Sequence, residues 1–287
     1  MKVKQMIQQH EESGRYFEVD GIRSFALDRG EGEAVLCLHG VPASSYLYRK
    51  VVPAIAHNGM RGIAIDFPGL GLADRPKEFD YSWSGLSTFC EKAAESLELK
   101  KFHLVVHDIG GPIGLMLAAR APEKILSVTI LNTLVDADEF HRPWMMAPFA
   151  WPIVDRLWLA SINHWVLYLL FVYTGIYEFS DTTRQEIYAY VDLLKRQDQG
   201  RAFLKIMKGF ELTKEVRNQC HAAVSNKDYP VQLLWGMQDR ALKFKKFGRR
   251  IMEVADLAAV TKLNGKHFLQ EDNAGAIADR IAQIAAT

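Results

Sequence analysis

The sequence predicts an α/β fold in which a mostly parallel, doubly wound sheet carries an inserted helical cap. Apolar, strand-like runs alternate with helix-like segments in the first part of the chain and again from Asp228 to the C-terminus. This alternation is the pattern of a parallel sheet wound by right-handed crossovers. Residues 135–227 lack the alternation and are rich in Trp, Phe, Tyr, Met and Leu. We therefore expect a core of residues 1–134 and 228–287, with residues 135–227 as the helical cap.

The first core segment predicts a hairpin followed by buried strands and helices. YFEVDGIRSFALDRG is typical of a β-hairpin with its turn at Asp20 and Gly21. The stretch SSYLYRKVVPAIAHNG has helical spacing, with Ser44 or Ser45 as its N-cap and Gly59 as its stop. We expect strands over residues 33–40, 61–67, 101–108 and 125–134. The helices between them are expected over residues 44–59, 84–97 and 110–122.

The middle segment predicts helices, and the last segment returns to strands. WVLYLLFVYTGIY, from Trp165 to Tyr177, is shorter than the roughly 20 apolar residues needed to span a bilayer, so we expect a buried or lid helix and no stable membrane insertion. YPVQLLWG and AAVTKLNG predict two further strands, and NAGAIADRIAQIAA predicts an amphipathic C-terminal helix. Helix-like segments of the middle part cover residues 152–160, 164–173, 183–194 and 201–210.

Composition excludes several classes of function. The formal net charge is +1 and no Lys/Arg block stands out, so we expect no nucleic-acid partner. Three cysteines without CxxC spacing argue against a disulfide framework or a zinc site and favour a reducing cytoplasm. No apolar signal-peptide core appears near the N-terminus. No cluster of metal ligands and no phosphate loop appears, so we expect no metal. GLGLAD follows a strand but lacks the GxGxxG spacing of a dinucleotide site, so we expect no organic cofactor. The oligomeric state is left open.

Polar residues lie just past the ends of five predicted strands. They belong to separate segments of the chain, and in open parallel sheets ligands bind at the carboxyl ends of strands. We therefore expect them to converge on one edge of the sheet, beneath the cap. They are the His39–Gly40 pair, Asp108, Asn132, Asp239 and His267.

Asp108 lies in VVHDIGG, a run of β-formers, then a charged residue, then small residues that open a helix. That outline matches the sharp strand-to-helix turn that presents a nucleophile, although a helix N-cap would also place an aspartate there. His267 follows the last strand, where a general base is expected, and Asp239 would orient it and stabilise its protonated form. Asp136 and Asp138 are rival acids that lie further toward the cap entrance.

An aspartate nucleophile favours particular substrates. A carboxylate can attack an sp³ carbon that bears a leaving group, and this gives an alkyl ester on the enzyme. His267 would then activate water to hydrolyse that ester, while the backbone N–H groups of Val41 and Ile109 hold the oxyanion. Attack on an ester carbonyl would instead give a labile anhydride. Asp108 therefore predicts cleavage of a carbon–halogen bond or an epoxide C–O bond.

Four segments resemble the haloalkane dehalogenase and epoxide hydrolase branch of the α/β hydrolases: HGVPASSYLYR, DFPGLGLADRP, VVHDIGG and KHFLQED. The resemblance covers nearly all of the core and implies an α/β-hydrolase fold with a catalytic triad of Asp108, Asp239 and His267. Two positions depart from it. Dehalogenases usually carry Trp directly after the nucleophile and many carry Asn in the HG-x-P loop, both as halide donors, where this chain has Ile109 and Val41.

The cap predicts an apolar pocket for a small-molecule substrate. Epoxide hydrolases normally use two cap tyrosines as acids, and the helix where the second is usual, GRAFLKIMKGFE, contains none. Trp144, Met145, Met146, Phe149 and Phe171 suit an apolar pocket or the core of the cap. Our candidate pocket residues are Trp151, Trp158, Tyr168, Tyr173 and Phe210.

Three readings of the function stay open at this stage. The first is a hydrolase that cleaves a C–halogen or epoxide C–O bond of a small apolar substrate through an ester on Asp108. The second is an ester or lactone hydrolase that uses the same residues. The third, a ligand-binding protein on a hydrolase scaffold, is the weakest, because a pure binder has no need of both Asp239 and His267.

Overall fold

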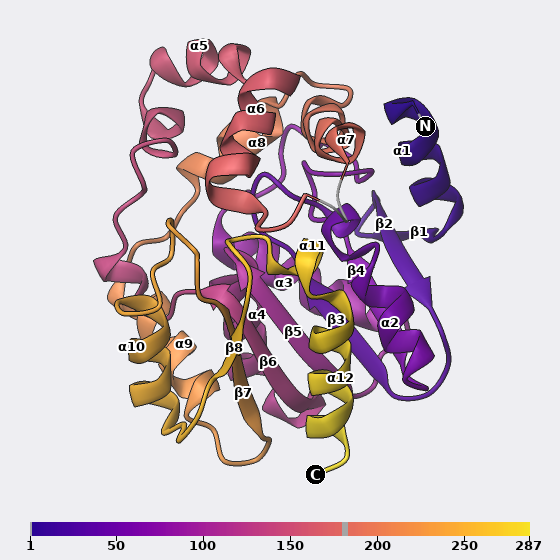
Figure 1. Cartoon of the computed structure of the whole chain (residues 1–287), viewed down its shortest axis with the longest axis vertical. Helices are drawn as coiled ribbons and strands as arrows, with labels where there is room; N and C mark the ends of the chain where they lie inside the picture. Colours follow the sequence, from indigo (N-terminus) through magenta and orange to yellow (C-terminus); the bar gives the residue numbers. More distant parts are fainter. Residues whose placement is uncertain (1, 180–182) are drawn as a thin grey trace.

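The computed structural model describes residues 2–179 and 183–287, so three residues of the expected cap lie outside the described part. The described chain forms an eight-stranded sheet in the order β1-β2-β4-β3-β5-β6-β7-β8 (Figure 1). β2 pairs antiparallel with β1 and β4, and the other pairs are parallel. The strands are β1 (Arg15–Val19), β2 (Ile22–Arg29), β3 (Ala34–Leu38), β4 (Arg61–Ile65), β5 (Phe102–Asp108), β6 (Ile125–Thr133), β7 (Val231–Gly236) and β8 (Thr261–Leu263).

The expected mostly parallel, doubly wound sheet and the N-terminal hairpin are confirmed. Every residue of β3 and β5 is buried, because helices cover both faces of the sheet. α3, α4 and α9 pack in a row, and α2 packs against α12. These core helices, with α10, are α2 (Val51–His57), α3 (Trp83–Ser96), α4 (Gly110–Arg120), α9 (Lys214–Val224), α10 (Phe247–Ala255) and α12 (Ala274–Ala285).

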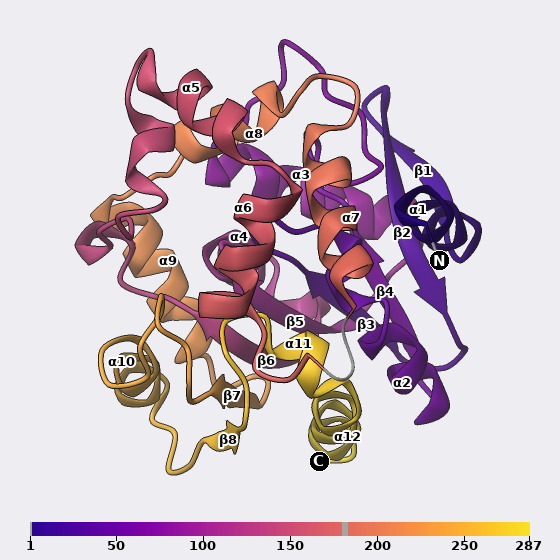
Figure 2. The ribbon, with the colours of Figure 1, turned by 45° about the horizontal axis from the view of Figure 1, so that its top comes forward.

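The remaining helices of the middle segment lie over the carboxyl ends of the strands (Figures 1 and 2). α6 runs directly into a π-helical turn. α1 (Val3–Glu12), near the N-terminus of the chain, packs against α7. The four helix-like segments expected in the cap correspond to α5–α8. The elements of the middle segment before α9 are η3 (Ala137–Glu139), η4 (Ala147–Ala150), α5 (Val154–Ser161), α6 (His164–Leu170), the π-helical η5 (Phe171–Gly175), α7 (Arg184–Lys195) and α8 (Arg201–Lys208).

The division into residues 1–134, 135–227 and 228–287 stays a prediction. α9, near the end of the middle segment, packs against α4 of the core. The short elements η1 (Ser45–Tyr48), η2 (Pro122–Lys124) and α11 (Leu269–Asp272) lie in the connections between core strands and helices.

The apolar middle segment raises the question of whether one of its helices could span a membrane. Within residues 2–179 and 183–287, no single helix is long and apolar enough to cross a bilayer. α5 and the run His164–Gly175 meet the length and composition criterion only as a pair, and the pair is bent by 88°. The run forms a lid helix over the core, with its inner side buried at Leu167 and Phe171.

Candidate active site

The polar residues expected at strand ends do meet at one edge of the sheet. β3, β5, β6 and β7 are parallel neighbours, so their carboxyl ends open on the same side. Asp108 is the last residue of β5, Asn132 lies at the end of β6, and Asp239 follows β7. His267 follows the short edge strand β8. All four side chains are buried.

Asp108 occupies a sharp turn between β5 and α4. Its φ of 52° lies in the left-handed region, which side chains other than glycine rarely adopt. The turn leaves no room for neighbouring side chains. A Cβ on Gly40 would lie 2.1 Å from Asp108 Oδ1, and a Cβ on Gly110 would lie 2.5 Å from the His39 carbonyl oxygen. Gly40 and Gly110 therefore leave room for the strained backbone at Asp108, which holds the carboxylate beneath the cap.

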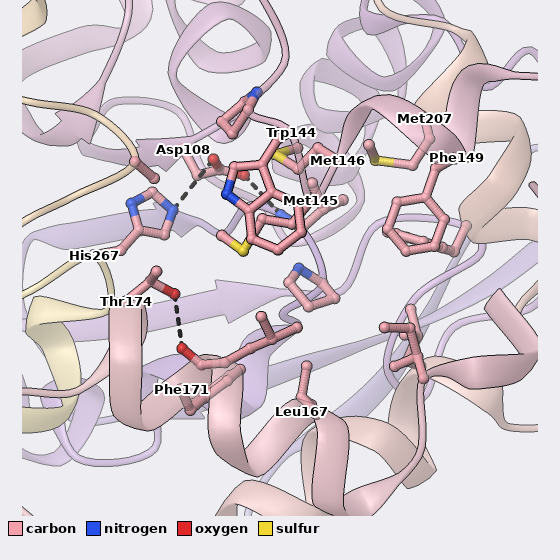
Figure 3. A pocket seen from close by; sticks show the side chains of 18 of the residues that line it. Asp108, Trp144, Met145, Met146, Phe149, Leu167, Phe171, Thr174, Met207 and His267 are labelled. Atoms are coloured by element: carbon pink, nitrogen blue, oxygen red, sulfur yellow. Dashed lines mark hydrogen bonds and ion pairs between the residues drawn. The ribbon is translucent and has the colours of Figure 1, made fainter. Parts of the chain in front are cut away.

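The two oxygens of Asp108 have different partners. The Val41 backbone N–H donates to Oδ1 at 2.8 Å, and Oδ2 lies 3.3 Å from His267 Nε2 (Figure 3). His267 Nδ1 lies 2.8 Å from Asp239 Oδ2. Asp108, His267 and Asp239 thus form one hydrogen-bonded chain, with Oδ2 on the histidine side and Oδ1 held by the backbone.

Asp239 is held in place by three further donors. The Asn132 side-chain amide donates to Oδ2 at 2.7 Å. The backbone N–H groups of Ala241 and Leu242 donate to Oδ1 at 2.7 and 2.9 Å. These bonds satisfy a buried carboxylate and fix the orientation that it imposes on His267. Asn132 was expected at this edge, but its bond to Asp239 was not predicted.

The loop that carries His267 is fastened to the cap and to β5. The His267 and Phe268 N–H groups donate to the carbonyls of Thr174 and Gly175, at 3.1 and 2.9 Å. Both acceptors belong to the π-helical turn, and such turns are frequent at functional sites. The ring of His107, with Nε2 2.8 Å from the His267 carbonyl oxygen, holds the loop from below. The position of His267 therefore depends on the cap as well as on the core.

The electrostatics of the three residues are coupled. Burial lowers the pKa of His267, but the Asp239 charge and hydrogen bonds to Asp108 and Asp239 outweigh it and raise the pKa to about 10. Burial raises the pKa of Asp108, yet the His267 hydrogen bond and charge, with smaller contributions from His107 and the Ile109 N–H, hold it below its usual value. At neutral pH the free protein therefore holds an ionised Asp108 beside a protonated His267.

A cavity of about 240 Å³ lies between this triad and the cap. Asp108 and His267 stand at its base, and Figure 3 shows Phe171, Leu167 and Phe149 around it. Three polar side chains of the lining already donate to backbone carbonyls: Trp158 to Met145, Thr174 to Leu170, and Ser161 to Trp158. The rest of the lining is apolar, apart from the indole N–H of Trp144, and consists of Val41, Pro42, Phe140, Pro143, Trp144, Met145, Met146, Phe149, Ile162, Val166, Leu167, Leu170, Phe171, Leu194, Phe203, Met207, Ala241, Leu242 and Phe268.

Of the five candidate pocket residues, the structure brings only Trp158 to the cavity. Trp151 and Tyr173 are each 55% exposed on the outside of the cap. Tyr168 turns toward Phe179 on the far side of α6. Phe210 is buried beyond the end of α8, where its ring centroid lies 4.9 Å from that of Trp83 at a tilt of 41°. The reason is helix phase, because Leu167, Leu170 and Phe171 occupy the side of α6 and η5 that faces the cavity.

Other sequence-based expectations can be placed in the same way. Asp136 pairs with His221 and Arg250, and Asp138 pairs with Arg217, so neither rival acid lies beside His267. Phe203 and Met207 were not predicted for the pocket, although their spacing of four residues puts them on one face of α8. In the part of the chain that the structure describes, no group of three or more His, Cys, Asp or Glu side chains could hold a metal ion.

The chain is similar to known α/β hydrolases. The family model described as "alpha/beta hydrolase fold" matches residues 33–171. "Haloalkane dehalogenase 2" of Mycobacterium tuberculosis is 26% identical over 282 residues, 94% of this chain and 93% of that protein. A "Haloalkane dehalogenase" of Psychrobacter cryohalolentis is 37% identical, but only over 131 residues, 43% of each chain.

A solved structure extends the likeness to a second kind of enzyme. The structure titled "Epoxide hydrolase CorEH without ligand" superposes with a TM-score of 0.77 at 19% identity, covering 95% of this chain and 98% of that one. At this identity the likeness shows the fold. Taken with the family model and the dehalogenase relatives, it supports an α/β-hydrolase fold for this chain and a likeness to the haloalkane dehalogenase and epoxide hydrolase-like branch.

Proposed function

We propose that this hydrolase uses Asp108 as a nucleophile on an sp³ carbon of a small apolar molecule and forms an alkyl ester on the enzyme. The observation that carries the proposal is the pair of contacts at Asp108: Oδ1 held by the Val41 N–H and Oδ2 facing His267 at the base of an apolar cavity. The proposed catalytic residues are Asp108, Asp239 and His267, with the N–H groups of Val41 and Ile109 as the oxyanion hole.

In the first step, Asp108 Oδ2 attacks the carbon, and the leaving group departs with the bonding electrons. The new C–O bond makes the aspartate an ester, so its negative charge disappears. The charge and hydrogen bond of Asp108 are among the causes that raise the pKa of His267. Ester formation removes them, and the pKa of His267 falls, which allows the imidazole to lose its proton and act as a base.

In the second step, neutral His267 takes a proton from water, and the hydroxide attacks Cγ of the ester. The oxyanion that forms at Oδ1 is stabilised by the backbone N–H groups of Val41 and Ile109. Asp239 remains ionised and stabilises the imidazolium. Collapse of the intermediate expels the alcohol, which takes its proton from His267, and leaves a carboxylic acid on Asp108. That acid gives its proton to the now neutral His267, which restores the carboxylate and the imidazolium. For a haloalkane the balance is R–X plus water giving R–OH, a proton and a halide ion.

The lining of the cavity favours a halide over an epoxide oxygen as the leaving group. An opening epoxide needs a proton on its oxygen, and no tyrosine is among the described residues that line the cavity. Tyr190, buried nearby, already donates to Glu271 at 2.5 Å. A halide departs without a proton. The side chains of Val41 and Ile109 offer it no hydrogen bond, so we expect slow turnover, fastest for bromides and iodides.

The proposal is tested by trapping the ester in a variant that lacks the base. His267→Gln is incubated with separate haloalkanes, epoxides and esters, and its intact mass is measured. An adduct with the mass of the substrate minus hydrogen halide is expected from bromoalkanes, because Asp108 is alkylated and not hydrolysed. An adduct with the full substrate mass would mean epoxide opening. The matched control, Asp108→Asn/His267→Gln, should give no adduct.

Two results would contradict the proposal. The first is the absence of an adduct with every compound while the folded variant still binds them, which would favour the ester-hydrolase or binding readings. The second is an adduct of equal yield in the double variant, since it would place the alkylation on another residue. Peptide mapping of the adduct separates Asp108 from the other carboxylates.

A further inference from the structure

The outer side of the cap exposes an unusual number of apolar side chains. Eleven large hydrophobic residues of the described chain are exposed, and ten of them lie between Trp144 and Tyr177. They sit on α5, α6 and the turns beside them, and α5 is the part of the cap farthest from the sheet (Figures 1 and 2). We call this surface the outer cap face and define it by six exposed side chains on α5, on α6 and beside them: Trp151, Ile153, Leu157, Trp165, Leu169 and Tyr173.

The same segment is almost free of charge. Asp155 and Arg156 are the only Asp, Glu, Lys or Arg residues between positions 143 and 177. Asp155 is buried and forms an ion pair with Lys208, so Arg156 is the one exposed charge of this stretch. A patch of this kind on a protein surface marks an interaction site.

Cations border the outer cap face. The Arg184 guanidinium lies 5.3 Å from the Trp165 ring centroid, and the Arg240 guanidinium lies 4.4 Å from that of Tyr173. Lys266 reaches the backbone at the same edge, with Nζ 2.6 Å from the Val172 carbonyl oxygen.

Acids also lie at this border among the described residues. Asp192 is paired with His164, and Asp272 accepts from the backbone N–H groups of Tyr177 and Glu178. Glu178 is an exposed carboxylate beside Tyr177.

Apolar aromatic side chains ringed by cations match an anionic lipid surface better than a second copy of the chain. Trp and Tyr are enriched where membranes meet water, and Arg and Lys are attracted to anionic headgroups. In a twofold dimer the face would meet itself, so a surface bordered by Arg156, Arg184 and Arg240 would be brought against a second surface bordered by the same cations. The 88° bend between α5 and the following helical run fits a pair that lies in the interface without crossing it.

The cavity above Asp108 opens on this side of the molecule. Of the residues that line it, Trp144 and Ser161 are exposed, and both belong to the segment that carries the outer cap face. Figure 3 shows Trp144 across the cavity from Leu167. A molecule dissolved in the acyl region of a bilayer would therefore reach the cavity without crossing bulk water.

We propose that the outer cap face docks peripherally on an anionic lipid bilayer and turns the mouth of the cavity toward it. The binding is a property of the surface and does not depend on the reaction at Asp108. Its test therefore uses no substrate, and its failure would leave the proposed chemistry intact.

The test is flotation of the full chain with vesicles of phosphatidylcholine alone or mixed with phosphatidylglycerol. We expect partitioning onto the mixed vesicles to be about tenfold higher, and to fall as salt is added. Trp151→Ser/Leu157→Ser/Trp165→Ser should abolish it, because all three side chains are exposed and contribute the apolar part of the contact. Arg156→Gln/Arg184→Gln should weaken it roughly tenfold. The charge-matched control, Arg29→Gln/Arg249→Gln, changes two exposed arginines outside the cap and should bind as the wild type does.

A measurement on the unmodified chain guards against a variant that fails to fold. Vesicles with brominated acyl chains should quench the fluorescence of the exposed tryptophans and leave that of the fully buried Trp83 and Trp235 unchanged. The proposal is overturned if no vesicle binds the protein, or if the binding ignores the substitutions on the outer cap face. It is also overturned if the chain is a dimer that those substitutions dissociate while vesicles do not bind.

Discussion

The side chain at the end of β5 is central to the proposed chemistry. Asp108 is buried, strained at φ 52°, and bonded through different oxygens to a backbone N–H and to His267. These contacts keep it ionised, because they hold its pKa below the usual value. In the proposed mechanism this ionised carboxylate, at the base of an apolar cavity, acts as the nucleophile. Its reactivity should therefore depend directly on His267.

The coupling predicts how His267 titrates when the aspartate loses its charge. Asp108→Asn mimics the uncharged ester, so the pKa of His267 should fall below the value of about 10 in the wild type. NMR titration of the His267 ring measures the change. Asp136→Asn removes a carboxylate that contacts His221 instead, and it should leave the His267 titration where it is. An unchanged His267 pKa in Asp108→Asn would contradict the proposed switch between the two steps.

Asn132 provides a second prediction at this scale. Its amide donates to the buried Asp239, so Asn132→Leu should lower the free energy of unfolding by about 1.5–3 kcal/mol. Asn58→Leu removes a similar amide–aspartate bond on the surface, and there the change should stay within about 0.5 kcal/mol. Urea unfolding of both variants gives the comparison. Equal losses at the two sites would mean that the buried bond to Asp239 contributes no more to stability than the surface bond of Asn58 does.

The sequence predicted the strand-end residues well because position along a parallel sheet is enough to bring them together. It did not predict the bond from Asn132 to Asp239, because the pairing of two side chains on different strands depends on register. Of its five candidate pocket residues, Trp158 alone lines the cavity of the described structure. Aromatic content marks a cap helix, but the phase of the helix decides which side chains face inward.

At the scale of elements, one buried ion cluster ties the cap to the catalytic loop. Arg49, after η1, donates to both oxygens of Glu271 in α11, at 2.6 and 2.8 Å. Its guanidinium also reaches Glu186 of α7 at 3.0 Å. Tyr190 of α7 donates to the same Glu271 carboxylate, which is fully buried. Core, cap helix and the segment after His267 therefore share a single cluster.

Breaking this cluster should be costly. Arg49→Met would leave Glu271 buried with weakened compensation, and the free energy of unfolding should fall by about 3–5 kcal/mol. Adding Glu271→Gln should recover part of the loss, because the uncompensated charge is removed. Arg15→Met breaks a half-exposed pair with Asp28 and should cost at most about 1 kcal/mol. A loss in Arg49→Met no larger than in Arg15→Met would contradict the account.

The sequence located most elements and missed those whose cause is tertiary. Periodicity and turn residues gave the strands of the core and the four cap helices. α1 was not expected, since its polar segment is anchored by contacts such as that of His10 Nε2 with Ser45 Oγ, 2.9 Å away. The π-helical turn was not expected either. Its carbonyls meet the N–H groups of His267 and Phe268, and nothing local in the sequence specifies that contact.

For the whole molecule, the raised pKa of His267 links stability to pH. The folded pKa of about 10 lies above the ordinary value of 6.5, so this contribution is complete below pH 6.5 and is lost as pH rises toward 10. The lowered pKa of Asp108 acts in the opposite sense, and its contribution is lost as pH falls below 3.8. Chemical unfolding between pH 6 and about pH 10 should therefore show declining stability in the wild type. His267→Gln should show a flatter curve, and curves of equal slope would contradict the ion pair.

For the molecule as a whole, the sequence sufficed to predict the α/β-hydrolase fold, since strand–helix alternation marks a parallel sheet. The division into core and cap and the roles of Asp108, Asp239 and His267 stay predictions. A cytoplasmic location and the absence of a cofactor stay predictions. The surface proposal concerns only how the cap meets its surroundings, whereas the chemistry depends on whether Asp108 becomes covalently attached to the substrate.

The most direct test of that central claim is a single turnover in H₂¹⁸O with enzyme in excess over a bromoalkane. If Asp108 attacks carbon and water then attacks Cγ, the alcohol leaves with an oxygen from the enzyme. The first-turnover alcohol should therefore be unlabelled, and the peptide that contains Asp108 should gain one ¹⁸O atom. An alcohol that carries the label, together with an unlabelled peptide, would show that water attacks the substrate directly and that Asp108 is not the nucleophile.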